Sequence, residues 1–154
     1  RYGPERTLPY IRKHAFIDLL TDFGPANPHP TAGAMCVGAR PILIAYNLWL
    51  KGSTLDVAKR ICAEIRSESV RTLALQVGSS VQVSMNLIAP EITGPDKVYD
   101  AVAQFAEIDR AELVGLVPSR TLAAIPRQRW AQLDLSTETT IEWNLAERNR
   151  KLRA

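Results

Sequence analysis

Apolar residues recur along this chain with two different periods, and these periods predict its secondary structure. Over residues 55–66 they return every three or four positions, which predicts an amphipathic helix that Ser53 and Thr54 cap. Over residues 81–90 they alternate with polar residues, which predicts a strand that Pro90 ends. The same criteria predict the remaining elements, which are helices over 8–20, 93–108, 121–125 and 140–153 and strands over 39–50, 72–78 and 111–119.

The order of these elements predicts the fold. Strand, helix, strand, strand, helix and strand, with helical extensions at both ends, is the order of a ferredoxin-like α+β sandwich, in which two helices cover one face of an antiparallel sheet. A chain of 154 residues is long enough for one domain with a core, so we expect a single domain over 1–154. Residues 1–9 lack a starting methionine and resemble a connector to a preceding part of a longer protein.

Alternation in the strands also predicts what the uncovered face of this sheet presents. Gln82, Ser84 and Asn86 point to one side of their strand, and Asn47 lies on the polar side of the first strand. If these sides coincide, the open face carries amides and a hydroxyl. Such a face is either only hydrated or meets a ligand or a partner sheet, and the pattern leaves both readings open.

Composition removes several classes of function. The 19 basic and 16 acidic side chains give a net charge of +3, which is too mild to indicate nucleic-acid binding. No apolar stretch has the length of a membrane span and the first residues do not form a signal peptide, so we expect a cytoplasmic protein. Cys36 and Cys62 lie in no metal-binding spacing, and we expect neither a metal site nor a disulfide.

The loop over residues 22–40 is the best candidate for a ligand site. Its prolines restrict the backbone, while its glycines and alanines leave room for another molecule to approach that backbone. Loops of this length without secondary structure are uncommon unless they are functional. His29 lies within it as a candidate binding group, and Arg40 at its end is suited to a carboxylate. His14 has no evident partner for acid-base catalysis.

Four segments together resemble the second subdomain of glutamate formiminotransferase, the folate-dependent enzyme of histidine degradation. They are RTLPYIRKHAF, DFGPANPHPTAGAMCVGARPILIAYNLWL, QVSMNL and ELVGLVP, and the resemblance runs from Arg6 to about Pro118. It implies transfer of a formimino group from N-formimino-L-glutamate to the co-substrate tetrahydrofolate, in a groove between two similar subdomains. It also implies folate contacts at Gly24, Pro25, Ala26, Asn27, Pro28, His29, Pro30, Thr31, Ala32 and Gly33.

The resemblance implies that the catalytic histidine belongs to an N-terminal subdomain ahead of Arg1, so we expect no catalytic residue in this chain. For the substrate we expect contacts from Arg40, Asn47, Gln82, Ser84 and Asn86. The N-terminal subdomain and a second copy of the chain, in a homodimer, are the expected protein partners. Two alternatives stay open: a ligand-binding module of this fold without turnover, and a dimerisation module that uses the bare sheet face.

Overall fold

The computed structural model of the chain describes residues 7–153. The chain separates into two compact units, residues 1–40 and residues 41–154. This division does not decide whether the two units form one domain, so the single domain expected over 1–154 stays a prediction. Of the connector predicted over residues 1–9, residues 1–6 lie outside the described residues, and helix α1 (Leu8–His14) begins directly after Thr7.

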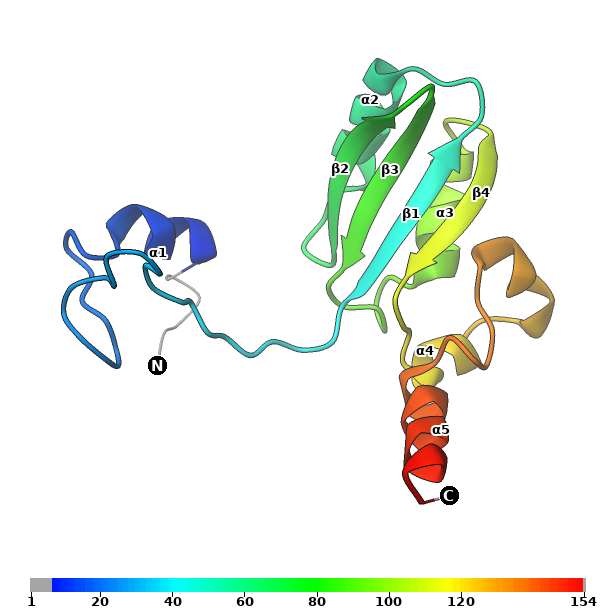
Figure 1. The fold of residues 1–154 in the computed structure, drawn as a ribbon. Coiled ribbons are helices and arrows are strands. Elements are labelled where there is room, and N and C mark those ends of the chain that lie inside the picture. The colour runs from blue at the N-terminus through cyan, green and yellow to red at the C-terminus, as the bar shows by residue number, and fades with distance from the viewer. Residues whose placement is uncertain (1–6, 154) are drawn as a thin grey trace. The chain divides into compact units, whose positions relative to one another are not determined.

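The larger unit is built on a four-stranded antiparallel sheet with the strand order β2-β3-β1-β4 (Figure 1). Its strands are β1 (Ile44–Leu50), β2 (Val70–Val77), β3 (Ser80–Leu87) and β4 (Ile108–Val114). Helices α2 (Leu55–Ile65) and α3 (Pro95–Ala103) cover the same face of this sheet (Figure 1). Both the order along the chain and the placement of the helices confirm the predicted ferredoxin-like α+β fold.

The core lies between the sheet and these two helices, and it follows the strand alternation. Every second residue of β1 is buried, and the side chains of Ile44, Tyr46 and Leu48 are 0% exposed. From β3 the core receives Val81, Val83, Met85 and Leu87, and from the helices Ala58, Ile61, Cys62, Val98 and Val102. Burying one such large apolar side chain contributes about 1.5–3 kcal/mol, so a shift of one residue in register would be strongly unfavourable.

The leading helix is shorter than the predicted span of residues 8–20. Helix α1 ends at His14, because Ala15 takes an extended conformation and Phe16 has a left-handed φ of +64°. The apolar residues beyond the helix do not form a buried stripe, since Ile17 and Leu20 are 83% and 77% exposed and Phe16 and Leu19 are only half-buried. Helical spacing alone was therefore misleading for this half of the segment.

All four predicted strands differ from the observed ones at their ends. Strand β2 spans Val70–Val77 instead of 72–78, and β3 spans Ser80–Leu87 instead of 81–90, so it ends before Pro90. Strand β1 begins at Ile44 rather than at residue 39, and β4 spans Ile108–Val114 instead of 111–119. Gly115 ends β4, because its φ of +94° turns the chain away from the sheet. Val117 then pairs with Thr140 in a single bridge, so the apolar residues after Gly115 are not part of the sheet.

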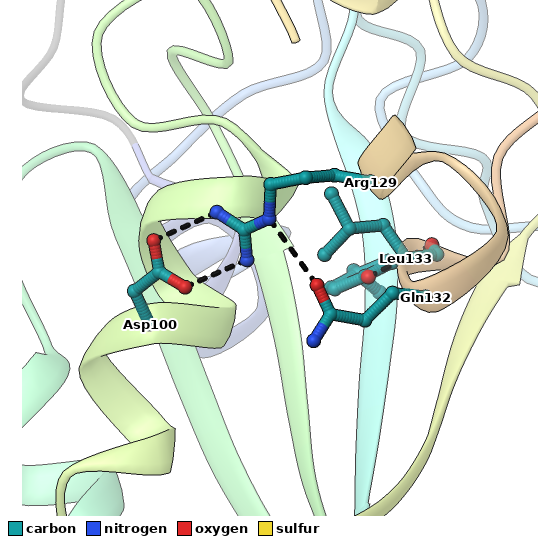
Figure 2. A network of polar contacts seen from close by, with 5 residues as sticks. Asp100, Arg129, Gln132 and Leu133 are labelled. Carbon is teal, nitrogen blue, oxygen red and sulfur yellow. Dashed lines mark hydrogen bonds and ion pairs between the residues drawn. The ribbon is translucent and has the colours of Figure 1, made fainter. Parts of the chain in front are cut away.

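The segment after β4 forms short helical pieces and a final longer helix. These are α4 (Ser119–Ala123), the 3₁₀ turns η1 (Arg127–Arg129) and η2 (Ala131–Leu133), and helix α5 (Ile141–Arg153). The turn η2 packs against β4, whereas α5 extends away from the sheet and buries none of its residues (Figure 1). Figure 2 shows Arg129 in contact with Asp100 of α3 through two hydrogen bonds of 2.8 and 2.7 Å, and with Gln132 at 3.2 Å. These bonds attach the 3₁₀ segment to the helical layer.

Strand β4 is an edge strand, and the same segment covers part of its edge. Asp134 has a left-handed φ of +55°, and its Oδ2 accepts a hydrogen bond of 2.9 Å from the backbone N–H of Leu113. An unpaired edge N–H is a template for pairing with another strand. Asp134 therefore removes one of the exposed donors of this edge.

Candidate functional site

The predicted ligand-binding loop contains one tight turn. His29 and Gly33 exchange backbone hydrogen bonds of 3.0 and 2.9 Å. Within the turn, Nδ1 of His29 accepts from the backbone N–H of Ala32 at 3.1 Å and of Thr31 at 3.3 Å. A ring nitrogen that accepts these bonds carries no proton, so in this tautomer Nε2 is the nitrogen that donates. The side chain of His29 thus stabilises the loop while its outer nitrogen stays available.

Helix α1 and this loop together line a cavity of about 1060 Å³. Its lining includes these predicted folate contacts: Pro25, Asn27, Pro28, His29, Pro30 and Gly33. Ile11, Phe16 and Leu19 contribute apolar surface from the other side. Small-molecule sites are typically concave, mostly apolar and a few hundred to about 1000 Å³ in volume, so the cavity has a suitable size and character.

Not every predicted contact faces this cavity. The lining omits Gly24, Ala26, Thr31 and Ala32, although all four belong to the same exposed loop. Arg40 is exposed at the end of the smaller unit. The role predicted for Arg40 in holding a substrate carboxylate stays a prediction.

The other predicted site residues lie together on the open face of the sheet in the larger unit. The register places Asn47 opposite Ser84, Ala45 opposite Asn86 and Trp49 opposite Gln82. Because the neighbouring residues of both strands belong to the core, all four predicted polar side chains share the uncovered face. The structure therefore brings Asn47, Gln82, Ser84 and Asn86 together, and their binding role stays a prediction.

Gln82 differs from its polar neighbours in burial. Its side chain is 7% exposed, and Oε1 has no hydrogen-bond partner within the described part of the chain. An unpaired buried amide oxygen costs free energy, about 1–3 kcal/mol in mutational data. Ser84 is half-buried and Asn86 is exposed on the same strand.

Sequence reasoning missed Glu112, which is the best-anchored polar group of this face. Its Oε2 accepts a hydrogen bond of 3.0 Å from Nδ2 of Asn47 and one of 2.8 Å from Nε1 of Trp49. The bond from Asn47, followed by that from Trp49, holds the pKa of Glu112 below its ordinary value. The guanidinium of Arg110 lies 4.2 Å from the centre of the Trp49 ring.

A local signal for Glu112 existed, because an acidic residue begins the otherwise apolar segment ELVGLVP. The connection to Asn47 could not be inferred from it. It depends on the pairing of β4 with β1, in which Glu112 lies opposite Asn47.

Arg71 and an apolar margin complete the open face. Arg71 is exposed and lies opposite Asn86 in the β2-β3 register. Leu73 and Val77 on β2, and Val114 on β4, are large exposed apolar residues at the two edges. The face therefore has a polar centre with apolar side chains at its sides.

His14 is the other histidine of the chain. His14 stacks on Tyr10 with 4.1 Å between ring centres, and its Nδ1 lies 2.9 Å from the carboxylate of Asp18. Across residues 7–153, no group of three or more His, Cys, Asp or Glu side chains is arranged to hold a metal ion. Within the same residues, no helix has the length and apolar character that crossing a membrane requires.

Comparisons with known proteins give several relatives. The chain is 36% identical over 118 residues to a glutamate formimidoyltransferase of Thermoplasma acidophilum, a match that covers 69% of this chain and 39% of that protein. It is 33% identical over 140 residues to a formimidoyltransferase-cyclodeaminase of Rattus norvegicus, covering 79% of this chain and 25% of that protein. A glutamate formimidoyltransferase of Streptococcus pyogenes is 29% identical over 117 residues, covering 68% of this chain and 39% of that protein.

This chain therefore spans well under half the length of the relatives it matches. No protein-family model matches it. The homodimer expected from the sequence finds no support in these comparisons.

Proposed function

Because this chain belongs to the glutamate formimidoyltransferase family, we propose that it is the folate-binding part of an enzyme that transfers a formimino group. The formimino (formimidoyl) donor would be N-formimino-L-glutamate and the acceptor tetrahydrofolate. The chain would correspond to the C-terminal subdomain of the transferase, with the N-terminal subdomain as its partner. The two alternatives, a binding module without turnover and a dimerisation module, are not favoured, since the relatives are named as transferases.

The cavity between α1 and the loop is the observation that supports this proposal most strongly. Its walls carry predicted folate contacts together with apolar side chains such as Phe16. Tetrahydrofolate has a bicyclic ring system and an aromatic linker, both of which are stabilised when apolar walls remove them from water. The outer nitrogen of His29 and the amide of Asn27 would supply polar contacts to the ring.

We assign the substrate to two further groups of residues. The amides and hydroxyl of Asn47, Gln82, Ser84 and Asn86 would bind its polar atoms on the open face. The position of these four residues together on the uncovered face of the sheet supports this assignment. Arg40 would bind a carboxylate of the substrate through a charge-assisted hydrogen bond.

The base that removes the proton from N5 of tetrahydrofolate would come from the N-terminal subdomain. We therefore expect this chain to bind a reduced folate without transferring the group.

Calorimetric titration of the chain with 5-formyltetrahydrofolate, a stable reduced folate, tests the proposal. We expect saturable binding that Ala34→Phe weakens, because Ala34 lines the cavity and a larger side chain would occupy it. Ala39→Phe is the matched control, since Ala39 belongs to the same exposed loop but does not line the cavity. Absence of binding, or equal effects of the two substitutions, would contradict a folate site here.

A further inference from the structure

Glu112 presents a carboxylate on the open face, and within the described residues only one of its two oxygens accepts hydrogen bonds. Asn47 and Trp49 both donate to Oε2. No hydrogen bond to Oε1 is found within residues 7–153. One oxygen thus fixes the orientation of the group, and the other is available to a ligand.

The surroundings keep this carboxylate rigid. Its two donors come from the adjacent strand β1, and the Trp49 ring is itself packed under the guanidinium of Arg110. All three residues of the hydrogen-bonded group are half-buried, which limits the other positions that their side chains can adopt. Groups held by a rigid scaffold in this way bind with a smaller loss of conformational entropy.

We propose that Glu112 binds the formimino group of the donor substrate and thereby selects it. This inference rests on the proposed function and extends it to one residue and one functional group. A protonated formimino group is an amidinium, which is planar, carries positive charge and directs two N–H donors to one side. The open Oε1 of Glu112 is the complementary partner for one of these donors, since charge-assisted hydrogen bonds to a carboxylate are short and strong.

The same geometry gives selectivity against a close analogue. N-formyl-L-glutamate has almost the same shape, but a carbonyl oxygen replaces the terminal nitrogen and the group is neutral. That oxygen would face the Glu112 carboxylate as a second acceptor. A site built to accept hydrogen bonds rejects a ligand that lacks the donor, because its own polar atoms are left unpaired.

The test measures discrimination between these two compounds. Calorimetric titrations of the full chain with N-formimino-L-glutamate and with N-formyl-L-glutamate give one ratio of dissociation constants for each protein. We expect wild-type protein to favour the formimino compound by at least about tenfold, which corresponds to one charged hydrogen bond. In Glu112→Gln, whose amide oxygen can still accept from Asn47 and Trp49, we expect the ratio to fall close to one.

Two further variants test whether Glu112 contacts the ligand or only supports the fold. Glu107→Gln removes the same charge at a carboxylate directly before β4 that pairs with Lys51 at 2.6 Å, and it should leave the ratio unchanged. Trp49→Phe keeps an aromatic ring but removes the donor to Oε2. As Trp49 is a positioning residue, this variant should give a ratio between those of wild type and Glu112→Gln.

Several results would overturn the inference. They are an unchanged ratio in Glu112→Gln, a wild-type protein that does not prefer the formimino compound or binds neither compound, and a loss of reduced-folate affinity in Glu112→Gln. Titration of the wild-type chain with 5-formyltetrahydrofolate distinguishes a wrong role for Glu112 from a wrong proposed function. If folate binds while the ratio is unaffected by Glu112→Gln, only the role of Glu112 is wrong.

Discussion

The hydroxyl of Tyr46, at the centre of the sheet, donates a hydrogen bond of 2.9 Å to the carbonyl oxygen of Leu133, 87 residues further along the chain. Both residues are 0% exposed. Burial raises the pKa of Tyr46 far above its ordinary value, so the hydroxyl stays protonated and continues to donate. This bond joins the sheet to the segment that follows β4.

Removing this hydroxyl should destabilise the larger unit. Tyr46→Phe leaves the buried carbonyl of Leu133 without its donor, and we expect a loss of about 1–3 kcal/mol in the free energy of unfolding. Urea denaturation followed by circular dichroism measures it. Tyr99→Phe is the control, because Tyr99 is half-buried and its hydroxyl makes no hydrogen bond among the described residues. Equal losses in the two variants would contradict the role of the Tyr46 bond.

Gly33 should be sensitive to substitution for a conformational reason. Its φ is +66°, which L-residues rarely adopt, although a Cβ there would contact nothing within 4 Å. Gly33→Ala therefore strains the turn by roughly 1–2 kcal/mol without a clash. If the turn belongs to the folate site, affinity for 5-formyltetrahydrofolate should fall roughly 5- to 30-fold.

Gly38→Ala is the matched control for this change. Gly38 belongs to the same loop, and a Cβ there also meets nothing within 4 Å, but its backbone is not left-handed. We expect its folate affinity to equal that of wild type. A Gly33→Ala protein that binds folate as well as Gly38→Ala would show that the turn is not needed for binding.

Glu112 should make stability depend on pH in the acidic range. Its pKa in the folded protein lies below the ordinary 4.5, because Asn47 and Trp49 donate to the ionised form. Its contribution is therefore complete above the ordinary pKa of the unfolded state and is lost as the pH falls through the lower folded-state pKa. Wild-type protein should lose more stability than Glu112→Gln between neutral pH and pH values well below 4.5.

Urea denaturation of both proteins across this range measures the difference. Asn47→Ala removes the donor with the larger effect on the pKa of Glu112. We therefore expect this variant, too, to lose less stability than wild type as the pH falls. Parallel pH profiles for wild type and Glu112→Gln would mean that the carboxylate is not stabilised in its ionised form.

Arg40 should contribute to substrate affinity if it binds a carboxylate. Arg40→Ala would then raise the dissociation constant for N-formimino-L-glutamate by about tenfold or more, the effect of one charged hydrogen bond. Arg12→Ala is the control, since Arg12 is also an exposed arginine of the same unit. Calorimetry on the two variants decides the matter, and equal affinities would leave Arg40 as an ordinary surface charge.

Many elements of the larger unit were predictable from residue patterns. Helix α2 and strand β3 follow the 3.6- and 2-residue periods closely, because both are half-buried and each period places one set of side chains in the core. The end of β4 was not predictable in this way. The apolar residues beyond Gly115 continue the hydrophobic pattern, but the chain has turned there, so that Leu116 is exposed whereas Val117 is buried.

The candidate site likewise has features that were predictable from the sequence and features that were not. The loop over residues 22–40 was recognisable from its prolines and glycines, and alternation placed Ser84 on the polar side of its strand. That Asn47 shares this face became clear only from the pairing of β1 with β3. The hydrogen bond between Asn47 and Glu112 joins residues 65 positions apart, and neither residue carries a local sign of the other.

Local periodicity was therefore enough to assign faces, since the face of a side chain depends on the backbone geometry of its own element. Local periodicity does not indicate which residues lie opposite each other on neighbouring strands. Hydrogen bonds between strands connect positions that are distant in sequence, and the pairing of β1 with β4 forms only when the whole sheet assembles. For that reason the polar side of each strand could be foreseen, whereas the meeting of these sides on one face, the anchoring of Glu112 and the bond from Tyr46 to Leu133 could not.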